Sequence, residues 1–501
     1  MTRRTRRRFL EESMLATAAA ALATPGAAVR ADDDDSSSSP NERLGVACVG
    51  VRGRGGSHLN FFAGRKDTEV VAIVDVDDTV LANRAKQVGQ RQGREPQRYV
   101  DLRKAFDDPR VDIVSIATPN HWHALAAIWA IQAGKDVYLE KPVSHNVSEG
   151  RRIVEAARKY NKICQTGTQS RSNPGMQAAI AHVRKGGIGH VDVARGLCYK
   201  RRKSIGARGR YDIPENIHYN LWLGPAPEAP LTRPRLHYDW HWQWPYGNGD
   251  LGNQGIHQMD IARWGLGLDQ LCRAVMSYGG RLGYEDAGDT ANTQVVILDY
   301  GDSTLVFEVR GLETGPLTRS RTGVEFQGGK YRPKIGVIFE GSDGYVVIPS
   351  YAGGAAFDRD GKMVQEFKGP GSDSHHFANF LKAVRSRQAS DLNADIEEGH
   401  LSSALCHLGN ISYRLGEMLP VSEVAKRVAK VDSRDNNGDT LERTLEHLKA
   451  NGLSLDKVRL QTGPVLRFDP SSETFVQNEE ADRMLTRQYR APFVVPPAGQ
   501  V

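Results

Sequence analysis

The stretch Leu44-Gly45-Val46-Ala47-Cys48-Val49-Gly50-Val51-Arg52-Gly53-Arg54-Gly55-Gly56 sets the fold class of this chain. Its first six residues are a short apolar run suited to a buried parallel strand, and the glycines that follow lead into a predicted helix from Ser57. A second apolar run, residues 70–74, ends at Asp75. A strand, a glycine loop, a helix, a strand and an acid, in this order, form the dinucleotide-binding fingerprint. Backbone N–H groups at the N-terminus of its helix face a pyrophosphate.

The glycine loop departs from this fingerprint at one position. With Gly50 as the first glycine and Gly55 as the third, Arg52 takes the place of the second. The close backbone approach to the ligand then depends on Gly53 or on a shifted loop, and Arg52 can contact a phosphate instead. Together with Arg54, these residues form the predicted cofactor-binding loop.

Asp75 is predicted to accept hydrogen bonds from the adenosine ribose hydroxyls. Its charge would repel a 2′-phosphate, so we expect NAD as the cofactor, while the nearby Arg52 leaves NADP open. The alternative, a solvated acid at the end of a strand, is disfavoured because Asp77 and Asp78 already supply polarity there.

Apolar runs and helical segments continue to alternate after Asp75. Residues 111–117 and 136–139 are predicted strands, and residues 124–133 form a predicted helix between them. This alternation predicts a doubly wound parallel sheet, and hence an α/β Rossmann domain. The loops at Thr118 and Glu140 then lie at the carboxyl edge of the sheet, where a nicotinamide ring would lie. Lys141, fixed by Pro142, is therefore a candidate catalytic group.

Several motifs follow one another in a fixed order: the glycine loop, Asp75, Ala117-Thr118-Pro119-Asn120 with His123, Ala133-Gly134-Lys135, Glu140-Lys141-Pro142, Gln169 with Arg171, and Gly255-Ile256-His257-Gln258-Met259-Asp260. This set resembles the glucose–fructose oxidoreductase/inositol dehydrogenase (Gfo/Idh/MocA) family over about residues 44–416. The resemblance implies a Rossmann domain followed by an α/β domain with a large, mostly antiparallel sheet, whose face often makes the contact of a homo-oligomer, a dimer or tetramer. It implies cofactor contacts from Thr118, Asn120, His123, Glu140, Lys141 and Gln169, and a substrate contact from Arg171.

The second half of the chain has a different pattern. Strands are predicted at residues 191–198, 294–300, 304–309, 335–339 and 344–348. No crossover helices separate the last four, which favours an antiparallel sheet. Residues 374–384 and 396–415 have helical spacing and are expected to close this domain.

His257 stands where the resembled family keeps its catalytic histidine, and Asn253 stands where many of its sugar dehydrogenases carry an aspartate. The two would share a face if one helix begins near residue 253. Oxidation of a carbinol needs a base for the hydroxyl proton and a cation near the oxygen. A histidine near its ordinary pKa of about 6.5 suits the first role. We assign His257 as the base, Lys141 as the group that stabilises the alkoxide, and Asn253 as a positioner.

Aromatic residues occupy every second position of the stretch 238–246. Such a pattern fits core packing on a strand or a loop that lines the substrate site, where aromatic faces suit sugar C–H surfaces. Under the second interpretation Trp240 and Trp242 bind substrate, together with Arg171, Asn253 and His257.

Three classes of ligand are weighed by composition and spacing. The histidine pairs 121/123, 237/241 and 375/376 lack a carboxylate or cysteine at metal-ligand spacing, so no metal is predicted. The net charge of +6 includes +3 before residue 29, which leaves no case for nucleic acid. The basic stretch 200–210 reads as a solvated loop, with binding of an acidic sugar as the alternative.

The N-terminal and C-terminal segments of the sequence allow further predictions. Residues 1–31 contain Arg6-Arg7-Arg8-Phe9-Leu10 and an apolar run, 14–23, too short to span a bilayer. They predict export by the twin-arginine route, to a periplasmic or other exported location, and five scattered cysteines fit export after folding. Residues 32–40 are a predicted linker, 41–164 the Rossmann domain and 165–418 the second domain. Residues 419–501 extend the chain, to cover either a neighbouring subunit or a sheet edge.

These patterns lead to three interpretations of function. An exported dehydrogenase has no free pool of cofactor, so we expect an NAD(P)-dependent oxidoreductase that acts on a sugar, polyol or glycoside and holds its cofactor tightly. The first alternative is an NAD-dependent glycosidase that oxidises a sugar hydroxyl transiently. The second is a sugar- or nucleotide-binding protein without catalysis, which Arg52 and Asn253 leave open and Lys141 and His257 argue against.

Overall fold

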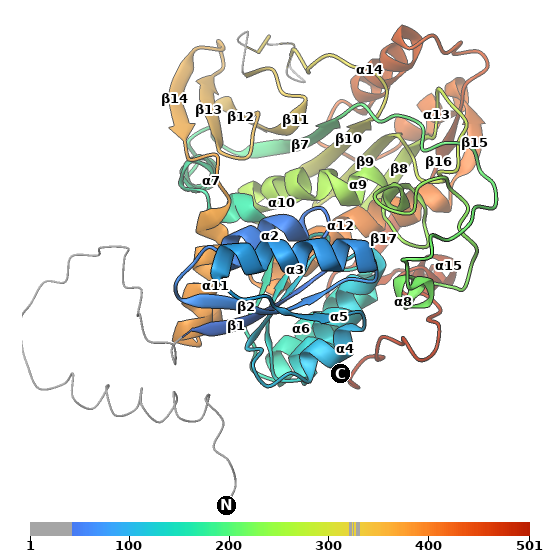
Figure 1. Ribbon diagram of the computed structural model, residues 1–501. Helices are drawn as coiled ribbons and strands as arrows, with labels where there is room; N and C mark the ends of the chain where they lie inside the picture. The colour runs from blue at the N-terminus through green and yellow to red at the C-terminus, as the bar shows by residue number, and fades with distance from the viewer. Residues whose placement is uncertain (1–42, 320–322, 324, 327–330) are drawn as a thin grey trace, which may run out of the picture.

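The computed structural model describes residues 43–319, 323, 325–326 and 331–501. The predicted signal peptide and linker lie outside these residues. Two sheets organise the described chain, one in each half, with helices layered against them (Figure 1). This architecture confirms the predicted α/β fold class.

The first sheet is parallel, with its described strands in the order β3-β2-β1-β4-β5-β6. Its central strands are buried on both faces, which explains their unbroken apolar runs. The strand order reverses between β1 and β4, and ligands bind at such a switch point. The bounds are β1 Leu44–Val49, β2 Thr68–Val74, β3 Gln97–Tyr99, β4 Ile113–Ile116, β5 Asp136–Leu139 and β6 Cys164–Thr166.

Helices cover both faces of the first sheet, and one of them comes from far along the chain. Helices α4, α5 and α6 pack on one face, and α2, α3 and α11 on the other. Phe377 of α11 stacks on Tyr138 of β5, with ring centroids 4.6 Å apart. The expectation that this helix closes the second domain is therefore wrong, because its apolar side completes the first. The bounds are α2 Gly55–Phe62, α3 Asp78–Gln92, α4 Leu102–Phe106, α5 Asn120–Gln132, α6 Val147–Lys159 and α11 Ser374–Ser386.

The second sheet is mostly antiparallel, with its described strands in the order β14-β13-β12-β11-β7-β10-β9-β8-β16-β15 and with β17 also paired to β8. One pair, β7 with β10, is parallel. The bounds are β7 Val191–Tyr199, β8 Ala274–Gly280, β9 Thr293–Asp299, β10 Thr304–Arg310, β11 Ile335–Gly341, β12 Gly344–Ile348, β13 Gly353–Asp358, β14 Met363–Lys368, β15 Glu417–Pro420, β16 Arg459–Thr462, β17 Leu466–Asp469 and β18 Thr474–Phe475.

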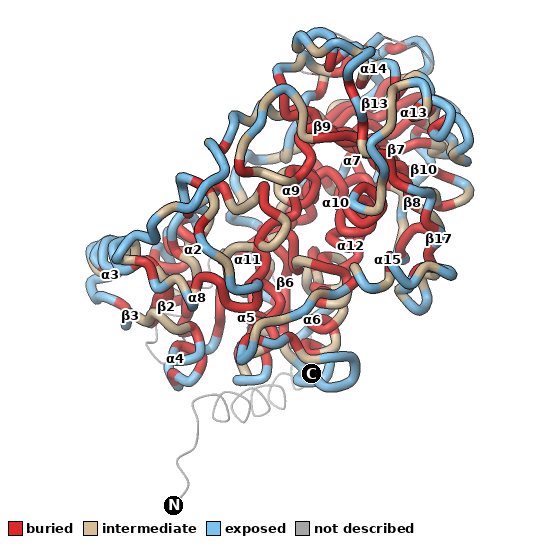
Figure 2. The backbone as a smooth tube through the Cα atoms, turned by 90° about the vertical axis from the view of Figure 1, so that its right-hand side faces the viewer, coloured by how far each residue is buried: buried red, intermediate tan, exposed pale blue. Residues whose placement is uncertain are grey.

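Helices also cover the second sheet. Residues of α7, α10 and α12 share one apolar cluster with the inner face of the sheet, and α12 also packs on α6 of the first domain. This layer lies between the two sheets, where Figure 2 shows a continuous buried region. The remaining bounds are α7 Pro174–Arg184, α8 Tyr219–Leu223, α9 Gly249–Asn253, α10 Gly255–Leu266, α12 Ile396–Arg414, α13 Val421–Val428, α14 Asn437–Ala450 and α15 Glu479–Arg483.

The C-terminal extension joins both domains. Strand β16 pairs with β8, so the extension lengthens the sheet at this edge. Val424 of α13 and Leu441 of α14 lie in an apolar cluster on the outer face of the same sheet. Beyond α15 the chain reaches the first domain, where Phe493 packs against Trp122 with ring centroids 5.4 Å apart. Of the two roles predicted for this segment, the structure places it on a sheet edge of its own chain.

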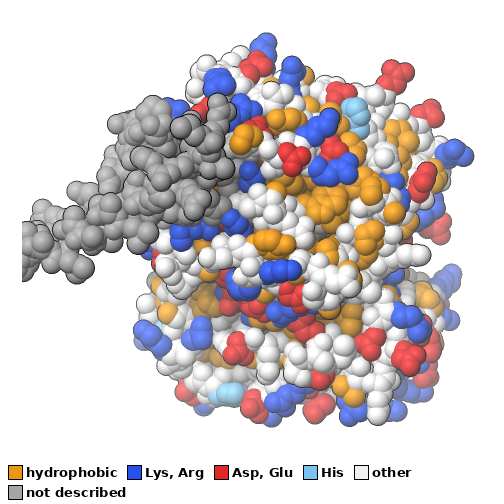
Figure 3. Space-filling model, turned by 90° about the horizontal axis from the view of Figure 1, so that it is seen from below, with side chains coloured by type: hydrophobic (Ala, Val, Ile, Leu, Met, Phe, Trp, Pro, Cys, Tyr) orange, Lys and Arg blue, Asp and Glu red, His pale blue; other side chains and the backbone are white. Residues whose placement is uncertain are grey.

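Two further properties are the distribution of charged side chains over the surface and the suitability of the helices for crossing a membrane. Figure 3 shows basic and acidic side chains interspersed on one face, with hydrophobic side chains between them. Among the described residues, no helix combines the length and the apolar character that crossing a membrane requires.

Candidate active site

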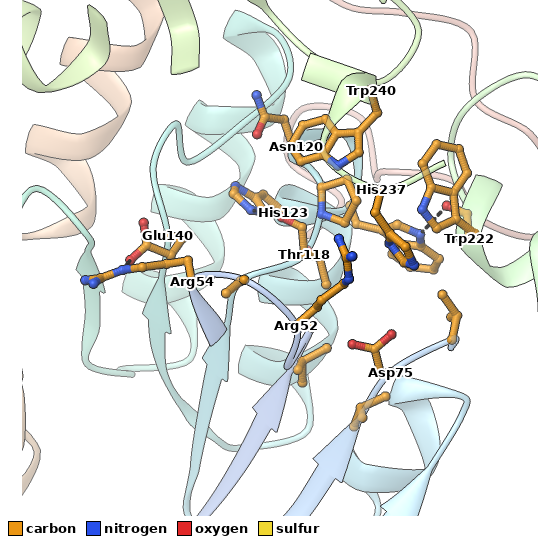
Figure 4. A pocket seen from close by; sticks show the side chains of 18 of the residues that line it. Arg52, Arg54, Asp75, Thr118, Asn120, His123, Glu140, Trp222, His237 and Trp240 are labelled. Carbon is orange, nitrogen blue, oxygen red and sulfur yellow. Dashed lines mark hydrogen bonds and ion pairs between the residues drawn. The ribbon is translucent and has the colours of Figure 1, made fainter. Parts of the chain in front are cut away.

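A cavity with a volume of about 410 Å³ lies at the carboxyl edge of the first sheet. Both domains line it (Figure 4). Residues from the predicted site that line it are Gly50, Arg52, Gly53, Arg54, Asp75, Thr118, Asn120, His123, Glu140, Lys141, Gln169, Trp240, Asn253 and His257. One pocket therefore brings together the fingerprint of the first domain and the histidine of the second.

The glycine loop has the geometry of a phosphate cradle. Gly50 has φ of +77°, and a Cβ there would lie 2.8 Å from the backbone of Ala117. A Cβ on Gly55 would lie 1.9 Å from the carbonyl oxygen of Gly50, so Gly55 serves helix packing and does not line the pocket. A Cβ on Gly53 would meet nothing within 4 Å, which leaves open space for a ligand to approach the backbone.

Asp75 lies at the end of β2, inside the pocket. Its carboxylate accepts hydrogen bonds from the N–H groups of Val51, at 2.9 Å, and Asp77, at 3.1 Å. Burial raises the pKa of Asp75 to about 6, against the effect of these bonds. Arg52 stands beside it, exposed, and its guanidinium has no ion-pair partner in the part of the chain that the structure describes. A carboxylate and an unpaired cation thus flank the predicted ribose site.

Arg54 and Glu140 form an ion pair, at 2.7 Å, at the floor of the pocket. A second carboxylate, Asp373, binds the same guanidinium at 2.6 Å, and His58 lies 3.2 Å from Glu140. The pKa of Glu140 falls well below its ordinary value because the charge of Arg54 and the hydrogen bond from His58 outweigh its burial. Arg54 thus pairs with two carboxylates through Nε and Nη1, while its buried Nη2 has no hydrogen-bond partner among the described residues.

Sequence reasoning missed both His58 and Asp373. His58 is fully buried, with Ser115 2.8 Å from its other ring nitrogen. Asp373 lies 319 residues from Arg54, and nothing in its local sequence distinguishes it from a surface acid. Only the packing of α11 on the first sheet brings it to the loop.

The remaining predicted cofactor contacts divide into two groups. Thr118 Oγ1 and Gln169 Oε1 are buried and have no hydrogen-bond partner among the described residues, so they are available to a ligand. The ring nitrogens of His123 instead lie 2.6 Å from the carbonyl oxygen of Pro142 and 2.8 Å from that of Thr118. Asn120 donates a hydrogen bond to Asn248 at 3.0 Å. His123 and Asn120 therefore hold the pocket wall together.

Lys141 and Asn253 meet across the two domains. The Lys141 ammonium donates a hydrogen bond of 2.7 Å to the backbone carbonyl of Asn253. Asn253 is the last residue of α9 and His257 belongs to α10, so the two do not share one continuous helix as predicted. The structure differs from the prediction because α9 ends at Asn253 and α10 begins at Gly255, with Gln254 between them.

The electrostatics of this end of the pocket differ from the expectation for His257. Burial, and next the charge of Lys141, lower the pKa of His257 well below its ordinary value, and its Nδ1 is buried with no partner among the described residues. Burial lowers the pKa of Lys141 from 10.5 to about 8, although the charge of Glu140 opposes this. At neutral pH the pair is therefore a neutral imidazole beside an ammonium.

Two predicted substrate contacts lie outside the pocket. The Arg171 guanidinium is buried and pairs with Asp260, at 2.9 Å, and with Glu398, at 3.0 Å. Trp242 is buried beneath the guanidinium of Arg202, 5.3 Å from its ring centroid. Both predictions are corrected: these side chains support the elements around the site and do not line it.

The aromatic stretch forms a single 3₁₀ turn, Asp239–Trp242, and so is not a strand. Trp240 lines the pocket, with its ring stacked on His241 at a centroid distance of 3.6 Å. Arg202 of the basic stretch pairs with Asp250 at 2.6 Å, so it is not part of a solvated loop. Among the described residues, no group of three or more His, Cys, Asp or Glu could hold a metal ion.

Comparisons with known proteins match both halves of the chain. Residues 44–168 match the family model "Oxidoreductase family, NAD-binding Rossmann fold", and residues 199–307 match "Oxidoreductase family, C-terminal alpha/beta domain", both of Gfo/Idh/MocA. Levoglucosan dehydrogenase of Pseudarthrobacter phenanthrenivorans is 30% identical over 178 residues, 35% of this chain and 38% of that protein. A glycosyl hydrolase family 109 protein of Shewanella pealeana is 33% identical over 123 residues, 24% of this chain and 27% of that protein. The chain thus spans well under half the length of these relatives.

Solved structures share the fold at low sequence identity. The WlbA dehydrogenase from Bordetella pertussis, in complex with NADH and UDP-GlcNAcA, is similar with a TM-score of 0.53 and 19% identity, over 73% of this chain and 95% of that one. A levoglucosan dehydrogenase in complex with NADH and levoglucosan has a TM-score of 0.53 and 18% identity, over 73% and 96%. These likenesses support the two-domain fold.

Proposed function

Because the chain belongs to the Gfo/Idh/MocA oxidoreductase family, with its NAD-binding Rossmann fold, we propose that it oxidises a hydroxyl group of a sugar, polyol or glycoside with a tightly held NAD. One observation carries this proposal. Lys141 and His257 line the same cavity as the glycine loop and Asp75, although they lie on different domains. An acid–base pair at a dinucleotide pocket suits removal of a proton and a hydride from one carbinol.

The residues present fit a bound dinucleotide. The open approach at Gly53 offers backbone contacts, and Thr118 Oγ1 and Gln169 Oε1, buried and without a partner in the described part of the chain, offer side-chain contacts. Asp75 keeps acceptor capacity for ribose hydroxyls beyond its two backbone bonds. Bound NAD would accept the hydride from the carbinol carbon, and reduction of a second carbonyl substrate would restore it on the protein.

Lys141 and His257 have separate roles in the reaction, stabilisation of the alkoxide and acceptance of the hydroxyl proton. We assign the imidazole of His257 as the acceptor of the hydroxyl proton; burial lowers its pKa, which leaves it unprotonated at pH 7 and also weakens it as a base. The ammonium of Lys141 stabilises the alkoxide as it forms, within a buried site where its charge acts strongly. The Asn253 carbonyl holds the ammonium in place, and the ring of Trp240 offers a face to a sugar.

A second function is favoured by the glycosyl hydrolase relatives. In it, transient oxidation of a hydroxyl acidifies the neighbouring C–H, a glycosidic bond is cleaved, and the oxidation is reversed. The matched relatives include several glycosyl hydrolase family 109 proteins, each aligned over about a quarter of this chain. The same pocket residues serve both reactions, so the products must distinguish them.

Mass spectrometry of the purified protein tests the cofactor first, by identifying retained NAD or NADP. A panel of sugars, polyols and glycosides is then added while the nicotinamide absorbance is followed. An oxidised sugar with reduced cofactor supports the dehydrogenase, and a cleaved glycoside without net redox change supports the glycosidase. If the purified protein binds no dinucleotide, both proposed functions are contradicted.

Export and assembly are also proposals. We propose export by the twin-arginine route from residues 1–31, which Arg6→Lys/Arg7→Lys should block in a fractionation assay. We also propose a homo-oligomer, a dimer or tetramer, to be tested by light scattering. Since α13 and α14 cover part of the outer face of the second sheet, contact between subunits would use another surface.

A further inference from the structure

A segment of the second domain, residues 216–241, lies against the pocket opposite the glycine loop, and we refer to it as the roof. Leu221, Trp222, His237, Tyr238 and Trp240 of the roof line the same cavity as Arg52 and Asp75. Figure 4 shows Trp222, His237 and Arg52 at one end of this cavity, beside Asp75. The roof therefore stands over the predicted adenosine end of the site.

The roof is fastened to the first domain on the side of Asp75. Ile217 pairs with Asp77 as an isolated antiparallel bridge, in which His218 N–H donates to the Val76 carbonyl at 2.9 Å and Asp78 N–H donates to the Asn216 carbonyl at 3.0 Å. Two side chains of the roof reach Asp77 as well. Asn216 donates to it at 2.7 Å, and His237 Nε2 lies 2.9 Å from its other carboxylate oxygen.

A second set of contacts fastens the roof on the opposite side. Trp122 Nε1 donates to the Leu221 carbonyl at 2.9 Å, and His121 Nε2 lies 2.9 Å from the Trp222 carbonyl. From the C-terminal extension, Arg490 donates to the carbonyls of Gly224, at 3.1 Å, and Asn220, at 2.7 Å. The roof thus crosses the pocket and is hydrogen-bonded on both of its sides.

The roof also has a core of its own. Trp222, Leu223, Leu231 and Leu236 belong to an apolar cluster that is separate from the clusters of both sheets. A segment with its own cluster can keep its shape while its few attachments to Asp77 break and re-form. Those attachments are hydrogen bonds, and beside them His218 Nε2 lies 3.1 Å from a carboxylate oxygen of Asp78 and Val76 packs against the cluster.

We propose that the dinucleotide is enclosed between the two domains, with Trp222 and His237 as binding residues for its adenosine half, and that it leaves only when the roof separates from Asp77. This inference rests on the proposed cofactor binding and adds the residues that control cofactor exchange. His237 suits the role because burial, despite its bond to Asp77, and then the charge of Arg52 lower its pKa, so it stays neutral at pH 7.

The attachment of the roof to Asp77 is tested by the dissociation rate of NADH. Protein loaded with NADH is diluted into excess NAD, and the fluorescence of bound NADH is followed over time. The variant Asn216→Ala loses a side-chain bond to Asp77 and leaves the pocket lining unchanged, and we expect roughly fivefold faster release. His190→Ala, an exposed histidine outside the pocket, is the control and should release NADH at the wild-type rate. An unchanged rate in Asn216→Ala overturns the proposal that the attachment to Asp77 controls release.

A cross-link supplies a second, independent test. The bridge between Asp77 and Ile217 has the pattern of a non-hydrogen-bonded pair, whose Cα atoms lie about 4.5 Å apart, within the range of a disulfide. We expect the oxidised Asp77→Cys/Ile217→Cys protein to release NADH at least about tenfold more slowly than the same protein after reduction. Equal rates, or failure of the two thiols to pair, overturn the proposal. A wild-type chain that binds no NADH instead overturns the proposed function.

Discussion

Lys141 Nζ donates a hydrogen bond to the backbone carbonyl of Asn253 at 2.7 Å, joining the end of β5 to the end of α9 across 112 residues of chain. The acceptor is a main-chain group, so the position of the ammonium does not depend on the identity of residue 253. The side-chain amide of Asn253 stays available to a substrate. This bond fixes a cation of the first domain next to the histidine of the second.

Lys141→Met should abolish most turnover while leaving NAD bound. Loss of a charge that stabilises a developing alkoxide costs on the order of 10²- to 10³-fold in kcat. The measurement is the reduction of bound cofactor by an active sugar, with cofactor content measured by mass spectrometry. Lys66→Met, at an exposed lysine, is the matched control. Turnover within twofold of wild type in Lys141→Met would remove this residue from the reaction.

The rate of oxidation should fall as the pH rises through about 8. Burial lowers the pKa of Lys141 from 10.5 to about 8, so the ammonium is present below this pH and is lost above it. Lys141→Arg keeps its charge at every accessible pH, and its residual activity should lack this alkaline decrease. A rate that instead increases through pH 8 would show that the neutral amine of Lys141 acts as the base.

Glu140→Gln should shift that decrease to lower pH. The charge of Glu140 raises the pKa of Lys141, and its removal lets burial lower this pKa further. The free energy of unfolding should also fall by about 3 kcal/mol, since Arg54 and His58 lose a buried partner. A pH profile and a urea titration measure the two effects, with the exposed Glu95→Gln as control. An alkaline decrease that does not move would separate Glu140 from the titration of Lys141.

Phe493→Ala should destabilise the protein by about 3 to 5 kcal/mol. The side chain is 2% exposed and packs against Trp122 and Trp129, with ring centroids 5.4 and 6.4 Å away. Val494→Ala is a control in the adjacent position, because Val494 is 45% exposed and its truncation leaves no cavity. Urea denaturation of both variants compares them. Equal stabilities would mean that the C-terminal segment does not pack on the first domain in solution.

Local sequence patterns predict the first sheet and the position of Lys141. The apolar run before Gly50, the acid after the run 70–74 and the alternation of strands and helices predict the first sheet, because buried parallel strands require unbroken apolar runs. The placement of Lys141 at the carboxyl edge follows from the same reasoning, since it is the second residue after strand β5.

Other features could not be read this way. Arg171 and Trp242 have the residue types of a substrate site, but their neighbours Asp260 and Arg202 come from distant parts of the chain and take up their side chains. The carboxylate of Asp373, which pairs with Arg54, comes from the start of α11, 319 residues further along the chain. Partners separated by tens to hundreds of residues leave no mark in local periodicity.

The sequence alone thus established a dinucleotide fold and the edge of the sheet where its site lies, because strand burial and turn chemistry are local properties of the chain. The contact of Lys141 with Asn253, the lowered pKa of His257 and the roof over Asp75 depended on how two domains pack. Burial, charge proximity and long-range hydrogen bonds are properties of that packing, so they appear only once the chain has folded.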